Sequence, residues 1–241
     1  MLRNCFNGLT GTNGLPRIID TEINLRNKKS RALEAAAEIG SFFGHSIRDS
    51  VSAFIEAQKT FDEYRRVVVS GTFPGDIPES KKSLKHLRSV KKDALKILLI
   101  GHPYNVYDSF VNMNIVEKLR RKSAEVFTID MFEEGLLRDK AEALRKRMFW
   151  NFGTLALGCI YQILGAEYVD GIIYLMSFGC GIDAFVCNMA ERRVREKSDI
   201  PYIVLTIDEH TGEVGLDTRI EAFIDLIRWR KRDEGYVPAF G

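Results

Sequence analysis

Residues 174–183 read YLMSFGCGID, a stretch in which an apolar run ends at a cysteine held between two glycines. In an α/β protein this pattern is typical of the end of a buried strand, a tight turn and the start of a helix. A thiol at such a place lies near unpaired backbone N–H groups and the positive end of a helix dipole, and both favour the thiolate. Cys180 is therefore a candidate metal ligand or nucleophile, with an ordinary turn residue as the alternative.

The segments around this stretch continue the alternation of strand and helix. Apolar runs that are typical of buried strands are followed by segments with helical spacing. Strands are expected at residues 95–101, 125–130, 171–176 and 202–207, and helices at 111–121, 136–164 (one long or two shorter), 182–196 and 216–231. The alternation predicts an α/β fold with a four-stranded parallel sheet flanked by helices, of the Rossmann or flavodoxin-like type. The near-continuous apolar strands indicate a sheet that is covered on both faces.

A helical region is expected to precede this sheet. After a glycine-rich N-terminal loop, residues 30–65 show apolar side chains at helical spacing, with Gly44 as a candidate break between two helices. Residues 81–92 contain basic side chains and no acid. We interpret them as a solvated linker or helix face, or as a surface for an acidic partner or a polyphosphate. The sequence thus predicts an N-terminal loop, helical region and basic linker over residues 1–92, and an α/β domain over 93–241.

The composition and net charge of the chain argue against two classes of partner, nucleic acids and membranes. The chain has 241 residues and a net charge of +2, whereas a dedicated nucleic-acid binder usually shows a strong basic excess. No apolar run approaches the roughly 20 residues that span a bilayer, and the first residues lack an apolar signal-peptide core. We therefore expect no nucleic-acid or membrane partner and a cytoplasmic location. The four cysteines, Cys5, Cys159, Cys180 and Cys187, are then expected to be reduced.

In a parallel sheet, ligands collect beyond the carboxyl ends of the strands. Polar or sulfur-bearing segments follow all four predicted strands, at residues 101–105, 130–132, 177–181 and 208–213. His102 and His210 could donate to an anionic ligand or transfer a proton, unless they are ordinary loop histidines. Asp208 could hold a cation, orient a histidine or cap the following helix. These three residues are the candidate catalytic residues.

A bound cofactor is expected to contact the backbone at this edge of the sheet. Gly179 permits close approach of a ligand, and Gly181 lies where the following helix starts. Arg219 lies in the first turn of the last helix, where it could reach the edge and pair with Glu213, Asp217 or a phosphate. Gly179, Gly181 and Arg219 are therefore candidate cofactor-binding residues. Gly101, after the first strand, also permits close approach, but neither Gly101 nor Gly179 belongs to a GxGxxG or Walker A pattern, so the motifs give only weak support for a nucleotide.

The other cysteines lie in different settings. Cys159 falls in an apolar helical stretch and is expected to be buried. Cys187 is expected in the core or beside the site, because seven residues of one helix separate it from Cys180 by about 10 Å. Cys5 lies in a glycine-rich loop, where it could be free or could swing to a metal. The sequence contains no CxxC pair and no ferredoxin-type array, so it does not indicate a self-contained four-cysteine site.

Three segments together resemble one protein superfamily. They are residues 101–104 (GHPY), 178–183 (FGCGID) and 207–223 (IDEHTGEVGLDTRIEAF). These segments are similar to the C-terminal part of the 2-hydroxyacyl-CoA dehydratase and benzoyl-CoA reductase superfamily. Within it they most resemble the activator-related branch, also described as acyl-CoA dehydratase activase-like, whose function is unknown. The resemblance extends over most of the chain from about residue 30 onward.

This resemblance implies a specific chemistry. Members of the superfamily carry a low-potential iron–sulfur cluster, either a [4Fe–4S] cluster held by three cysteines between two α/β domains or a double-cubane cluster. A separate ATP-hydrolysing activator drives electrons into it. By this resemblance Cys180 is a cluster ligand, and Cys5 takes roughly the place of a second ligand, although Phe6 follows it where the family has proline. His102, Asp208 and His210 would surround the cluster and control its protons.

The superfamily also has an upstream α/β domain that supplies a further ligand. By resemblance, we expect this domain in a separate partner chain, or a cluster that is shared between two copies in a homodimer. The expected function is an iron–sulfur redox protein or subunit that accepts low-potential electrons from the ATP-dependent activator. The alternatives are a non-catalytic partner subunit without a cluster, and a metal-free enzyme that binds an acyl-CoA or phosphate ligand at the same edge.

Overall fold

The computed structural model describes residues 19–23, 29–77, 94–144, 146–166 and 168–233. The chain forms two compact units, residues 1–66 and 67–241. The predicted boundary between residues 92 and 93 lies outside the described residues, as do the basic residues 81–92 and Cys5. Among the described helices, none combines the length and the apolar content that a membrane crossing requires.

Within its described residues, the first unit contains two helices, as the sequence predicts. Helix α2 spans Lys29–Phe42, and helix α3 spans Ile47–Val69 with its last turn in the second unit. Gly44 separates them with a φ of +79°, a left-handed conformation that glycine adopts at little cost. Ser46 caps α3, because its Oγ accepts a hydrogen bond from the backbone N–H of Asp49 at 3.1 Å.

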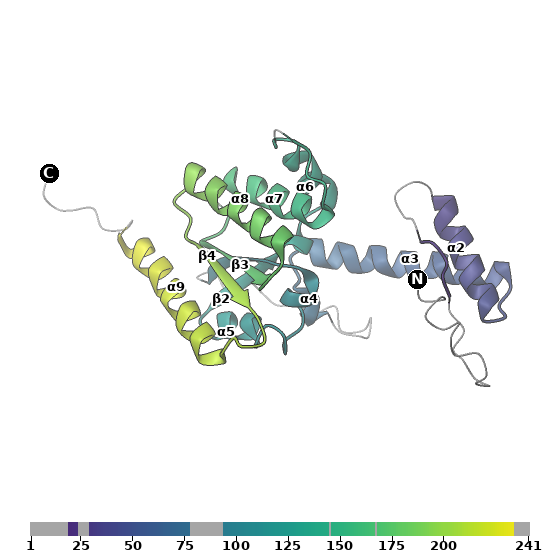
Figure 1. Ribbon diagram of the computed structural model, residues 1–241, viewed down its shortest axis with the longest axis horizontal. Coiled ribbons are helices and arrows are strands. Elements are labelled where there is room, and N and C mark those ends of the chain that lie inside the picture. The colour runs from purple at the N-terminus through teal and green to yellow at the C-terminus, as the bar shows by residue number, and fades with distance from the viewer. Residues whose placement is uncertain (1–18, 24–28, 78–93, 145, 167, 234–241) are drawn as a thin grey trace, which may run out of the picture. The chain divides into compact units, whose positions relative to one another are not determined.

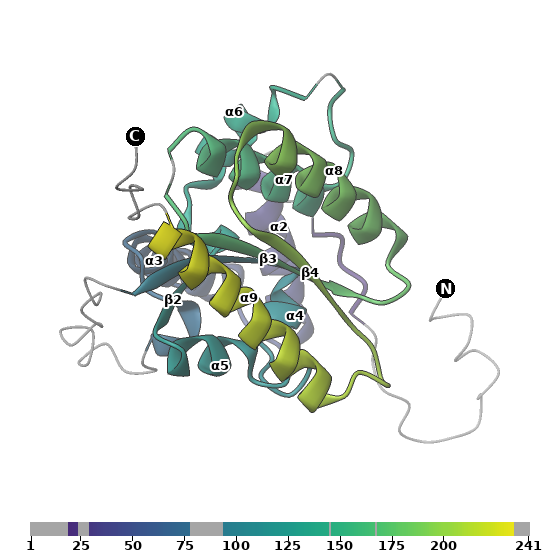
Figure 2. The ribbon, with the colours of Figure 1, turned by 90° about the vertical axis from the view of Figure 1, so that its left-hand side faces the viewer.

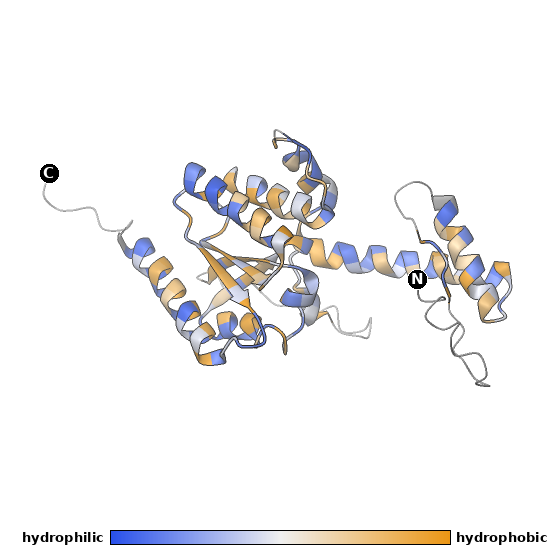
Figure 3. Cartoon of the chain, in the orientation of Figure 1, coloured by the Kyte–Doolittle hydropathy of each residue, from blue (hydrophilic) through white to orange (hydrophobic). Residues whose placement is uncertain are grey.

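The second unit is built around a four-stranded, all-parallel sheet (Figures 1 and 2), which confirms the predicted fold class. Strands β1 to β4 span Leu95–Ile100, Ala124–Thr128, Gly171–Ser177 and Tyr202–Ile207. Their order is β2-β1-β3-β4, which is the flavodoxin-like order of a doubly wound sheet. The two central strands are mostly buried and the edge strand β4 is largely half-buried, and Figure 3 shows the strands as the hydrophobic layer of this unit.

Helices cover both faces of this sheet. The described helices that follow β1 to β4 along the chain are α4 (Pro103–Val106), α5 (Ile115–Arg121), α6 (Glu134–Ala141), α7 (Asn151–Leu164), α8 (Gly181–Lys197) and α9 (Glu213–Asp233). Two short 3-10 helices are η2 (Pro74–Asp76) and η4 (Ile129–Met131). Figures 1 and 2 show α7 and α8 over one face and α5 and α9 over the other. The segment predicted as one or two helices over 136–164 is two helices. The strand predicted to reach Asp130 ends at Thr128, because η4 follows it directly.

The helix predicted for residues 111–121 begins later, at Ile115. Met113 and Asn114 have φ angles of 53° and 58°, and this left-handed backbone cannot continue a regular helix. Asn112 accounts for the break. Its buried amide donates to two carbonyl oxygens of α4 at 2.9 and 2.8 Å, and its Oδ1 accepts a hydrogen bond from the N–H of Ile115 at 3.2 Å. This side chain therefore bonds the backbone locally, in competition with the helix.

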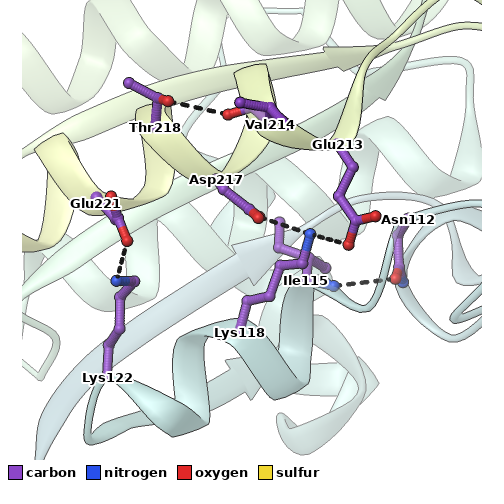
Figure 4. A network of polar contacts seen from close by, with 9 residues as sticks. All are labelled: Asn112, Ile115, Lys118, Lys122, Glu213, Val214, Asp217, Thr218 and Glu221. Atoms are coloured by element: carbon purple, nitrogen blue, oxygen red, sulfur yellow. Dashed lines mark hydrogen bonds and ion pairs between the residues drawn. The ribbon is translucent and has the colours of Figure 1, made fainter.

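Ion pairs tie α5 to α9 (Figure 4). The Nζ atom of Lys118 lies 2.8 Å from a carboxylate oxygen of Glu213 and 2.6 Å from one of Asp217. Further along the same two helices, Lys122 pairs with Glu221 at 2.7 Å. The Lys118 side chain is 14% exposed and that of Lys122 is 29% exposed. Lys118 is therefore the stronger link, because it is less exposed and serves two carboxylates.

We expect Lys118→Met to lower the free energy of unfolding by about 1 kcal/mol, the upper end for partly exposed ion pairs. The matched control, Lys122→Met, removes one more exposed pair and should cost only about 0.3 kcal/mol. Urea unfolding at low and high salt measures both, and salt should reduce the Lys118 effect by screening. Equal costs for the two substitutions at low salt would contradict this ranking.

Candidate functional site

The carboxyl ends of β1 and β3 meet where the strand order changes direction. The chain passes from β1 to β2 on one side and later reaches β3 on the other, so the segments that leave β1 and β3 diverge. Such a switch point leaves a crevice in which ligands bind. Gly101 keeps the two strand ends close, since an added Cβ would lie 2.8 Å from the carbonyl oxygen of Leu175. His102 follows β1 and Cys180 follows β3, so two predicted site residues flank this point.

Cys180 lies at the predicted junction of strand, turn and helix. It is the N-cap residue of the 17-residue helix α8, and its N–H donates to the carbonyl oxygen of Ser177 at 3.3 Å. Gly179 before it has a φ of +78°. A Cβ added at Gly179 or Gly181 would meet no atom within 4 Å, so the backbone on both sides of the cysteine is open. Cys180 is half-buried at the start of the helix.

The other described cysteines are enclosed. Cys159 in α7 is fully buried, as predicted, and burial raises the pKa of its thiol far above the ordinary range. Cys187 in α8 is also buried, which raises the pKa of its thiol to about 11, and its Sγ lies 3.7 Å from the phenol oxygen of Tyr202. Within the described residues, no three His, Cys, Asp or Glu side chains are grouped to hold a metal ion. Taken alone, the described residues do not fit an iron–sulfur cluster, because they offer one cysteine that is not buried.

His102 is held by side chains from several elements. Its imidazole stacks on Phe152 of α7 at a centroid distance of 3.8 Å and on Tyr104 of α4 at 5.1 Å. Its Nε2 lies 3.5 Å from Oδ1 of Asp183, the third residue of α8. The side chain of Asp183 is 0% exposed, and its Oδ1 also accepts a hydrogen bond from the phenol of Tyr174 in β3 at 3.1 Å. The fold therefore surrounds one imidazole with groups from α4, α7 and α8.

Asp183 was not among the candidate residues predicted from the sequence. Burial raises the pKa of its carboxyl group, and the positive charge of His102 and the hydrogen bond from Tyr174 only partly oppose that rise. Burial also raises the pKa of Tyr174 and of Tyr104, and the negative charge of Asp183 adds to both shifts. One signal in the sequence could have found this residue. Tyr174 is a lone tyrosine in an aliphatic strand, and a buried phenol usually has a hydrogen-bond partner.

A second buried polar group lies at the ends of β1 and β3. Asn105 in α4 is 1% exposed, and its Oδ1 accepts a hydrogen bond from the hydroxyl of Ser177 at 3.1 Å. Its Nδ2 is buried without a hydrogen-bond partner among the described residues, and so is Oδ2 of Asp183. Such atoms are costly to bury, so they mark places where water or a ligand group completes the network.

The candidate residues after β4 have local partners. Oδ1 of Asp208 accepts hydrogen bonds from the hydroxyl of Thr211 at 2.7 Å and from the N–H of His210 at 3.0 Å. The bond from Thr211 is the main reason that the pKa of Asp208 is lowered. The His210 side chain is 86% exposed. Arg219 donates to the carbonyl oxygen of Val204 in β4, and the two acids expected to pair with it bind α5 instead. Within the described residues, none of these side chains contacts the histidine after β1.

Large apolar side chains lie exposed in the segments after β1 and β3 and just before α7. Phe178, Ile182 and Phe185, in the turn after β3 and the start of α8, are 73%, 38% and 54% exposed. Tyr104 is 57% exposed and Phe149, just before α7, is 86% exposed. We call these five residues the apolar collar. They lie in the segments that follow β1 and β3 or precede α7, and large exposed apolar side chains of this kind are a feature of interaction surfaces.

Comparison with known proteins adds two findings. The family described as CoA enzyme activase uncharacterised domain (DUF2229) matches residues 1–132, a segment that includes His102 and ends before Cys180. The "Putative dehydratase subunit YjiM" of Escherichia coli (strain K12) is 31% identical over 86 residues, which cover 30% of this chain and 22% of that protein. The chain thus matches about a fifth of the length of this curated relative.

Proposed function

This chain belongs to the family of the CoA enzyme activase uncharacterised domain (DUF2229), and we propose that it is a subunit of a dehydratase-type redox system served by an ATP-dependent activator. Within the 2-hydroxyacyl-CoA dehydratase superfamily, we assign it to the acyl-CoA dehydratase activase-like branch. Its reaction class is the transfer of low-potential electrons toward a CoA-linked substrate. The similarity to a protein named as a putative dehydratase subunit supports this class.

One observation carries the proposal, namely the position of the half-buried Cys180 at the N-terminus of α8 and beside the switch point. Cysteine binds iron through its deprotonated sulfur, and the other described cysteines, Cys159 and Cys187, are buried in the core. We assign Cys180 as one ligand of an iron–sulfur cluster, of the [4Fe–4S] or double-cubane type. The remaining ligands come from Cys5, which lies outside the described residues, or from another polypeptide, either an upstream-domain partner or a second copy.

The apolar collar supports a site that is shared with another polypeptide. Four of its five side chains lie in the segments that leave β1 and β3, as His102 and Cys180 do, and a second protein surface would remove their exposed area from water. Each 100 Å² of apolar surface covered in this way contributes about 2.5 kcal/mol, so a few such side chains stabilise a complex appreciably. Coverage would also shield a cluster from solvent.

Cys180→Ser is expected to abolish iron–sulfur binding after anaerobic reconstitution with iron and sulfide. Cys187→Ser is the matched control, because Cys187 lies in the same helix but is buried against Tyr202, and it should retain the iron and sulfide content. Iron and sulfide analysis and electron paramagnetic resonance spectra of the reduced protein measure both. An unchanged spectrum for Cys180→Ser would remove Cys180 from the ligand set. Cys5→Ser separates a ligand from this chain from one supplied by a partner.

A specific observation favours a metal-free alternative. The backbone at Gly179 and Gly181 is open beside the first N–H groups of α8, and such helix N-termini bind anionic groups. In this alternative the same edge binds an acyl-CoA or phosphate ligand without a cluster. A rise in melting temperature with acyl-CoA in iron-free protein would favour it. Co-purification of a second chain without iron would instead favour a non-catalytic partner subunit.

A further inference from the structure

Asp183 occupies a position from which an acidic side chain normally caps its own helix. At the third position of α8, its carboxylate could accept the N–H of the N-cap residue. Here the N–H of Cys180 donates to Ser177 instead, and Asp183 is 0% exposed, between His102 and Tyr174. The buried carboxylate therefore contacts His102 and Tyr174 and does not cap the N-terminus of α8.

A buried carboxylate is stable only if nearby groups compensate its charge. The titratable groups around Asp183 are the phenols of Tyr174 and Tyr104, the thiols of Cys187 and Cys180, and the imidazole of His102. Of these, the imidazole is the only one that can carry positive charge. Within the described residues, the ion pair of Asp183 is the one with Nε2 of His102. The N–H at Nε2 of His102 is therefore the group that compensates the negative charge of the Asp183 carboxylate.

We propose that Asp183 is a positioning residue that keeps a proton on Nε2 of His102, so that Nδ1 is the atom offered to a ligand at the carboxyl edge. Phe152 and Tyr104 fix the plane of the ring by stacking, and the His102 side chain remains 23% exposed. The imidazole is therefore not closed off from solvent, and a ligand can approach its exposed part. The inference goes beyond the proposed function, because it assigns proton chemistry that needs no metal.

The chemistry that follows is the transfer of one proton. Nδ1 accepts the proton of a ligand O–H or S–H group, and Nε2 keeps its own proton toward Asp183. The imidazolium that forms is stabilised by the carboxylate, as in other histidine–carboxylate pairs. No electron changes place. The return of the same proton from Nδ1 restores the resting pair, so His102 serves as base and then as acid.

Nitrogen NMR of the full-length, iron-free chain with labelled histidines tests this assignment at about pH 9, where histidines are ordinarily neutral. The chain has four histidines, and His102→Gln identifies the resonances of interest. We expect the wild-type His102 ring to carry its proton on Nε2. In Asp183→Asn the amide can present an N–H to Nε2, so the Nε2–H tautomer should be lost and replaced by Nδ1–H.

Two controls separate positioning from a general structural effect. Tyr174→Phe removes the phenol oxygen but keeps the carboxylate, so the Nε2–H tautomer should remain. Asp208→Asn changes an acid in the loop after β4 and should leave the His102 resonances unchanged. A wild-type ring protonated on Nδ1, or a tautomer unchanged in Asp183→Asn, would overturn the proposal. If Asp183→Asn does not fold, the wild-type tautomer alone decides. The outcome is independent of the cluster, because the sample contains no iron.

Discussion

Replacement of Gly158 by alanine is expected to lower the free energy of unfolding by about 3 kcal/mol. Gly158 lies in α7 where α6 packs on it, and an added Cβ would lie 2.0 Å from the carbonyl oxygen of Leu137 and 2.7 Å from its carbonyl carbon. Both atoms belong to the backbone of α6, so no side-chain rotation relieves the clash and the helices must separate. The higher helix propensity of alanine, worth about 1 kcal/mol, offsets only part of this cost.

Gly165→Ala is the matched control for this substitution. Gly165 ends α7 with a φ of −87°, and the nearest atoms to an added Cβ are 3.7 and 3.9 Å away. Alanine fits there without strain, so the free energy of unfolding should stay within about 0.5 kcal/mol of the wild type. Urea unfolding measures both variants, and the slope of the free energy of unfolding against urea concentration should be the same for both. Equal stability of the two variants would mean that the close packing of α6 on α7 does not constrain the fold.

The fold class could be predicted from the sequence because its strands are buried on both faces. Near-continuous apolar runs identify such strands, and the helical segments between them require parallel pairing. The order of the strands and the start of α5 could not be predicted in the same way. The start of α5 depends on the side chain of Asn112, which bonds the carbonyl oxygens of α4 and the N–H of Ile115. Contacts of this kind follow from tertiary structure and leave no periodic pattern.

Only those residues of the candidate site that follow the ends of strands could be predicted from the sequence. His102 and Cys180 come directly after β1 and β3, so the parallel sheet alone brings them to one edge. Asp183 could not be recognised in that way, since an acid in the first turn of a helix is common for reasons of the helix dipole. Its role depends on burial against Tyr174 and on the approach of His102, which only the packed structure provides.

The protein is expected to lose stability steeply above about pH 9. Burial is the main reason for the raised pKa values of the Cys159 and Cys187 thiols and of the Tyr174 and Tyr202 phenols in the folded state. In the unfolded chain they titrate near their ordinary values of 9.0 for a thiol and 10.0 for a phenol. Below those values their contribution is fully present. Above them the unfolded chain loses protons that the folded protein retains, so each group favours unfolding by about 1.4 kcal/mol per pH unit.

Cys159→Ala isolates one of these groups, because burial is the one cause of the raised pKa of Cys159. The substitution should cost about 1 kcal/mol at neutral pH, since it leaves a small cavity in the core. Above about pH 9 the difference from the wild type should shrink by about 1.4 kcal/mol per pH unit and then change sign, because the variant has no thiol to keep protonated. Cys187→Ala should show the same convergence only up to about pH 11, where the folded thiol itself titrates. Urea unfolding of reduced protein at stepwise pH measures these curves, and parallel curves for the wild type and Cys159→Ala would contradict the assignment.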